Sequence, residues 1–73
     1  MLKQINNMIF NTNSIEQIYF KEFRELVIRT NSGDETYFFI NLKDGTHSIK
    51  IITELNELLR DPRVTFIDLN DLI

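Results

Sequence analysis

Residues 36–52, TYFFINLKDGTHSIKII, form two apolar runs that meet at Asp44-Gly45. Asp-Gly between two β-prone segments is a strong hairpin signal, because Gly adopts positive φ without steric cost and Asp tolerates it. We therefore predict a β-hairpin whose return strand is Thr46–Ile52. Apolar residues occupy both faces of the first arm, Tyr37–Leu42, which is typical of a central strand covered on two sides.

The chain before this hairpin predicts further short strands. Met8–Phe10 is a short apolar run, and the turn-forming cluster Asn11–Ser14 ends it. Arg24–Thr30 alternates, with Leu26 and Ile28 on one face, and predicts a strand. The polar segment 31–35 supplies Gly33 for a turn into the hairpin, so we expect a meander of antiparallel strands.

Residues 14–23 fit two structures. Ser14 and Gln17 make a helical capping box, and apolar residues recur at helical spacing through Phe23. β-branched and aromatic residues are nevertheless concentrated here, which favours a strand at Ile15–Phe20 and a turn at 21–22. We predict the strand and keep the helix as the alternative.

The C-terminal third predicts one helix and a final strand. Thr53 is a suitable N-cap for a helix at Glu54–Arg60, with an alternative start near Ser48 because Ile51 and Ile52 extend the same stripe. Asp61-Pro62 ends the helix, since Pro disfavours α geometry in the residue before it. Val64–Leu69 alternates as a strand, and we expect the apolar end of the chain to be docked.

The predicted fold is a single α+β domain spanning residues 1–73. It has four or five short, mainly antiparallel strands, one helix packed on one face, and a final short strand or docked tail. With 73 residues and no Cys, the domain has a small core and no disulfide, so stability must come from packing or self-association.

Composition narrows the function classes. A net charge of −3 argues against a nucleic-acid binder, which usually carries a basic face. No segment approaches the roughly 20 apolar residues of a membrane span, and the start of the chain lacks a signal-peptide pattern. We expect a cytoplasmic protein without a membrane partner. The abundance of Ile and Asn hints at an AT-rich genome, such as that of a low-GC bacterium or its phage.

No catalytic constellation is visible in the sequence. His47 is the single imidazole, and Ser48 beside it would point to the opposite face of a strand. The carboxylates form no run, and two glycines as separated as Gly33 and Gly45 cannot build a phosphate-binding loop. We therefore expect no enzyme activity, no cofactor and no metal.

The second face of the predicted sheet is the candidate interaction site. If the face of Leu26 and Ile28 packs under the helix, the other face presents apolar and charged side chains that need covering. Either a terminal segment of the chain covers them, or they contact another copy or another protein. The residues of this candidate site are Val27, Arg29, Tyr37 and Phe39.

The leading functional hypothesis is a non-enzymatic protein–protein interaction module. It would be a homo-oligomer and a small regulator or inhibitor of a larger intracellular protein, with a phage or mobile-element origin in keeping with its composition. The alternative is a small anionic-ligand binding protein with its pocket between subunits. In that case Arg29, Arg60 or Arg63 would receive the anion.

Overall fold

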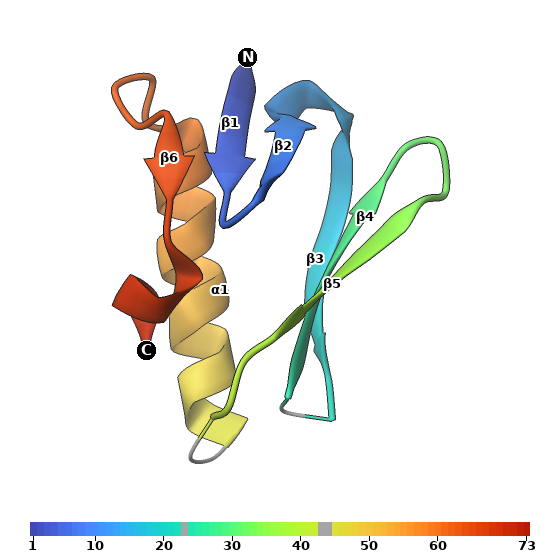
Figure 1. The fold of residues 1–73 in the computed structure, drawn as a ribbon. Coiled ribbons are helices and arrows are strands. Elements are labelled where there is room, and N and C mark those ends of the chain that lie inside the picture. The colour runs from blue at the N-terminus through green and yellow to red at the C-terminus, as the bar shows by residue number, and fades with distance from the viewer. Residues whose placement is uncertain (23, 43–44) are drawn as a thin grey trace.

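The computed structural model describes residues 1–22, 24–42 and 45–73 of the chain. The predicted α+β class, with mainly antiparallel short strands and one helix, is confirmed (Figure 1). The described elements, in chain order, are β1 Leu2–Ile5, β2 Met8–Asn11, the 3-10 turn Thr12–Ser14, β3 Ile15–Lys21, β4 Glu25–Thr30, β5 Glu35–Phe39, α1 Gly45–Arg60, β6 Phe66–Ile67 and the 3-10 turn Leu69–Leu72.

Three strands form the terminal sheet, in the order β2-β1-β6. β1 and β2 are antiparallel, and Asn6, with φ 51°, makes the turn between them. β6 pairs with β1 in parallel, so the two ends of the chain meet in one sheet. Beyond β6, the Leu69 amide donates to Asn6 Oδ1 at 2.9 Å and the Leu69 side chain is buried. The end of the chain is therefore docked, as expected.

The other three strands form the meander sheet, in the order β3-β4-β5 and antiparallel throughout. Residues 15–21 are a strand, so the helical alternative for this segment is wrong. Glu22 has φ 56° at the first turn, and Gly33 has φ 90° at the second. The predicted turn at Gly33 is thus confirmed, because positive φ is the conformation that glycine adopts without strain.

The centre of the meander sheet is β4, not the segment around Tyr37. β4 carries three consecutive fully buried residues, Leu26, Val27 and Ile28. β5 lies at an edge of the sheet, so the prediction of a central strand here is wrong. The apolar residues on both faces of β5 indicated two-sided burial, yet Phe39 is 76% exposed.

The predicted return strand Thr46–Ile52 is also wrong, because this segment is the first half of α1. Asp44 of the predicted turn lies outside the described residues. Ile49 is 71% exposed whereas Ile51 is 1% exposed. Residues two apart share a face of a strand but lie on different sides of a helix, so burial follows the helical period. The loss in helix propensity for isoleucine is below about 0.7 kcal/mol per residue, less than burial of its side chain gains.

Thr53 lies inside α1 and is not its N-cap. Its hydroxyl donates to the Ile49 carbonyl at 2.8 Å, one turn earlier. The helix has 16 residues and is longer than the two turns predicted for Glu54–Arg60. Its length agrees better with the alternative start near Ser48. It ends at Arg60, immediately before Asp61-Pro62, as predicted.

The core lies where α1 meets the two sheets (Figure 1). Phe10 of the terminal sheet and Phe38 of the meander sheet pack with ring centroids 6.2 Å apart and planes tilted by 56°. Leu55 of α1 is fully buried in the same cluster. The helix thus covers one face of the meander sheet, and the opposite face is left for the candidate site. The buried members of the cluster are Ile5, Phe10, Leu26, Ile28, Phe38, Ile40, Leu55, Ile67 and Leu69.

Candidate functional site

The four residues predicted from the sequence lie on one face of the meander sheet. Val27 of β4 pairs with Tyr37 of β5. Arg29 follows Val27 by two positions on β4, and Phe39 follows Tyr37 by two positions on β5. Paired residues and their i±2 neighbours project to the same side of a sheet. We call this side the outer face, because Leu26, Ile28 and Phe38 project into the core from the other side. Its residues are Gln17, Tyr19, Lys21, Glu25, Val27, Arg29, Glu35, Tyr37 and Phe39.

The four predicted residues differ in what they offer to a partner. Val27 is 0% exposed, so its side chain is covered by its neighbours and cannot contact a partner directly. Arg29 is exposed. Tyr37 is 50% exposed and Phe39 is 76% exposed, both on edge strand β5. The accessible aromatic surface therefore lies at one border of the outer face.

Tyr19 covers the middle of the outer face, and the sequence did not single it out. Its hydroxyl donates to Glu35 Oε2 at 2.6 Å. Tyr19 pairs with Val27 on β4, whereas Glu35 belongs to β5, so this hydrogen bond bridges the two outer strands across β4. The tyrosine side chain must lie over the central strand, which accounts for the burial of Val27. If the register of β3 and β4 is derived from a hairpin turn at Glu22, Tyr19 lies opposite Val27. This pairing was the signal in the sequence that could have identified Tyr19.

Glu35 accepts hydrogen bonds from both tyrosines of the chain. Besides Tyr19, the Tyr37 hydroxyl donates to Glu35 Oε1 at 3.5 Å. The hydrogen bond to the Glu35 carboxylate, together with partial desolvation, raises the pKa of Tyr19 above its ordinary value of 10.0. Glu35 thus fixes the orientation of both rings by hydrogen bonds, so the outer face offers ordered aromatic side chains.

A second exposed apolar face, which the sequence pattern did not predict, lies on the terminal sheet. Gln4 pairs with Ile9 on one side and with Phe66 on the other. Ile9, Phe66 and nearby Leu2 are all exposed. The sequence signal for this face was weak, because β1 does not bury its apolar residues and expose its polar ones in the usual way. Leu2 points outward, whereas Lys3 is buried.

Among the described residues, no group of three or more His, Asp or Glu side chains could hold a metal ion. His47 is half-buried near the start of α1, in a helix and not on a strand. Asp61 and Arg63 form an ion pair at 3.0 Å, so the charge of Arg63 is already paired. Of the three arginines considered for an anion, Arg60 lines a pocket beside the last turns of α1.

No family model, no curated protein and no solved structure matches this chain. Along residues 1–22, 24–42 and 45–73, no helix combines the length and apolar character needed to cross a bilayer. The candidate site therefore stands on geometry alone, and its distinguishing element is β5, an edge strand with two exposed aromatic residues.

Proposed function

We propose that the protein is a non-enzymatic protein–protein interaction module that pairs with a second copy of itself through edge strand β5. The observation that carries this proposal is the combination of an open strand edge with the exposed side chains of Tyr37 and Phe39. Aromatic residues are enriched at the centres of protein interfaces, and sheet edges bind partners by adding a strand.

The ladder of the meander sheet fixes which backbone groups of β5 are available. The Thr30 amide donates to Asp34 O at 2.9 Å, and the Ile40 amide donates to Arg24 O at 2.7 Å. In an antiparallel ladder, hydrogen-bonded pairs alternate with non-hydrogen-bonded pairs. The even-numbered residues of β5 therefore bond β4, and the odd-numbered residues direct their N–H and C=O groups to the open edge. These outward residues are Glu35, Tyr37 and Phe39.

β5 lacks the features that usually protect a sheet edge. Proteins blunt exposed edges with Lys, Pro, bulges or very short strands. β3, at the opposite edge, ends in Lys21 and has a register shift between Ile15 and Gln17. β5 has five residues, none of them Lys or Pro, and its register with β4 is regular. The terminal-sheet edges are shorter, with four residues in β2 and two in β6.

In the proposed dimer, two copies pair through this edge with two-fold symmetry. Antiparallel pairing about Tyr37 places Tyr37 opposite the same residue of the partner and Glu35 opposite Phe39. No acid then lies directly opposite an acid, an arrangement that would be destabilising. The pairing strand is short, so we expect a small interface and a micromolar dissociation constant.

The test is the solution mass measured by light scattering after size exclusion, over a range of concentrations. We expect a dimer that dissociates on dilution, and a monomer for the double variant Tyr37→Ser/Phe39→Ser at the same concentrations. Ile49→Ser is the control, because Ile49 is also exposed but lies on α1, and this variant should associate as the parent does. A parent chain that stays monomeric, or a double variant that still dimerises, would refute pairing through β5.

A further inference from the structure

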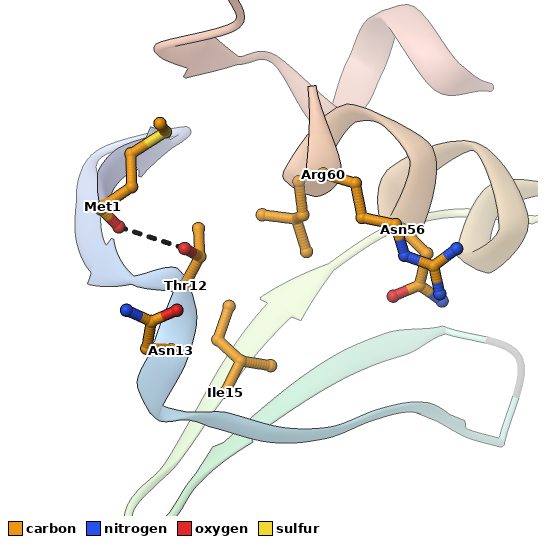
Figure 2. A pocket seen from close by; sticks show the side chains of 7 residues that line it. Met1, Thr12, Asn13, Ile15, Asn56 and Arg60 are labelled. Atoms are coloured by element: carbon orange, nitrogen blue, oxygen red, sulfur yellow. Dashed lines mark hydrogen bonds between the residues drawn. The ribbon is translucent and has the colours of Figure 1, made fainter. Parts of the chain in front are cut away.

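A pocket of about 470 Å³ lies between the last turns of α1 and the segment from Thr12 to Ile15 (Figure 2). Its volume is within the range of small-ligand sites. Asn56 and Arg60 form the helix side, and Met1, Thr12 and Asn13 form the opposite wall (Figure 2). The complete lining is Met1, Thr12, Asn13, Ile15, Asn56, Leu59 and Arg60.

Arg60 is the one cationic side chain of this lining, and no carboxylate within the described chain neutralises it. Its sequence neighbour Asp61 is occupied by Arg63, whose Nε and Nη2 donate to the two carboxylate oxygens at 3.1 and 3.0 Å. Glu57, one turn earlier on α1, makes no ion pair with it across the described residues. The guanidinium therefore retains its donors for a ligand.

The C-terminus of α1 would normally repel an anion, because its free carbonyls carry partial negative charge. Here Lys3 of β1 supplies a compensating positive charge. The buried Lys3 Nζ donates to Leu58 O at 2.8 Å and to Asp61 O at 2.5 Å. The Lys3 ammonium thus satisfies carbonyls at the end of α1, beside Arg60, and offsets their partial negative charge.

The rest of the lining suits a ligand with an apolar body. Ile15 and Leu59 are half-buried and give the pocket an apolar surface. Within the part of the chain that the structure describes, the side-chain amides of Asn13 and Asn56 have no hydrogen-bond partner, so both can bind polar atoms of a ligand. Asn56 and Arg60 are four residues apart and lie on one side of the helix.

We propose that this pocket binds a small carboxylate, with Arg60 receiving the carboxylate oxygens and a branched apolar body resting on Ile15 and Leu59. A planar guanidinium matches a carboxylate with two parallel hydrogen bonds. The ligand can be a free acid or the C-terminus of a peptide, since both present the same group. The site includes no residue of β5, so it does not depend on pairing through that strand.

The test is a titration followed by the backbone amide signals in two-dimensional NMR spectra. The probes are 4-methylpentanoate for a free acid, N-acetyl-leucine for a peptide C-terminus, and N-acetyl-leucine amide as the neutral counterpart. We expect saturable shifts at Asn13, Asn56 and Arg60, with millimolar affinity for acids of this size. The neutral amide should bind at least about tenfold more weakly, as expected for loss of a charge-assisted hydrogen bond. A stronger response to one acid identifies the source of the ligand.

Two variants remove the same charge at different places. Arg60→Gln should weaken binding of the preferred acid about tenfold or more and leave the weak binding of the neutral amide unchanged. Arg29→Gln, on the outer face of the meander sheet, should leave both unchanged. Dispersed spectra of both variants establish that they are folded. Shifts that do not saturate, equal binding of acid and amide, or equal losses in the two variants would overturn the proposal. The double variant Tyr37→Ser/Phe39→Ser should still bind the acid, which keeps this result separate from the test of association.

Discussion

Lys3 and Leu58 are 55 positions apart in the chain, yet the Lys3 ammonium donates to the Leu58 carbonyl at 2.8 Å. The same ammonium bonds the Asp61 carbonyl. The carbonyls of the last helical turn have no partners within the helix, and a cation at this end also interacts favourably with the helix dipole. Lys3 therefore joins β1 to α1 and satisfies backbone groups in a buried setting.

Replacing Lys3 by Met should destabilise the fold. The substitution retains an unbranched apolar stem but leaves the two carbonyls without this donor, which costs about 1–3 kcal/mol for a buried polar group. The measurement is the free energy of unfolding from urea titrations. Lys50→Met, at an exposed position of α1, is the control and should change it by less than about 0.5 kcal/mol. A loss of stability no larger than that of the control would show that the buried contact contributes nothing.

Local patterns in the sequence predicted the α+β class, the β3–β4–β5 meander, the turn at Gly33 and the end of the helix before Pro62. The features that the sequence did not predict depend on contacts between residues distant in sequence. Lys3 is buried only because its ammonium meets the end of α1, and no periodicity of residues 1–5 indicates this. β5 has apolar residues on both faces but lies at an edge, because strand order is set by pairing and not by composition.

The shared face of the four residues proposed as a site was predicted, but its surface was not. Strand alternation placed Val27, Arg29, Tyr37 and Phe39 on one face, and the structure brings them together there. It could not show that Val27 is covered, because Tyr19 reaches across from β3 to bond Glu35 on β5. That contact depends on the register of three strands, which pairwise alternation does not specify.

The helical identity of residues 45–52 has a direct mutational signature. Ile51 is buried on the core side of α1, so Ile51→Ala should cost about 2–5 kcal/mol through lost burial and a residual cavity. Ile49→Ala should change stability by less than about 0.5 kcal/mol, because Ile49 faces solvent. In a strand, both side chains would share one face and the two losses would be similar. Urea unfolding of the two variants distinguishes these cases.

The pairing of Tyr19 with Glu35 predicts a loss of stability at alkaline pH. The hydrogen bond to the Glu35 carboxylate raises the pKa of Tyr19 in the folded chain above the ordinary 10.0. A raised folded pKa means that folding favours the neutral phenol. Its contribution to stability is fully present below pH 10.0 and is lost as the pH rises through the folded pKa.

The pKa of Tyr19 can be followed alone by tyrosinate absorbance in a Tyr37→Phe background, because the chain has 2 tyrosines. Glu35→Gln in this background should lower the pKa of Tyr19 toward its ordinary value, since the carboxylate no longer accepts the phenol proton. Asp34→Asn is the control, because Asp34 accepts from Ser32 and not from Tyr19. Equal effects of the two substitutions would indicate a general charge effect instead of the hydrogen bond.

The register of the proposed dimer can be fixed by cross-linking, because the chain has no cysteine of its own. Two-fold pairing about Tyr37 brings Glu35 of one copy and Phe39 of the other to a Cα separation of about 5.5 Å, within the range that a disulfide spans. A mixture of Glu35→Cys and Phe39→Cys chains should therefore form a cross-linked heterodimer under mild oxidation. Either variant alone should cross-link far more slowly, since the Cα atoms of its own cysteines lie roughly 14 Å apart in this register. Cross-linking of each variant alone at the rate of the mixture would contradict this pairing, and non-reducing electrophoresis measures both rates.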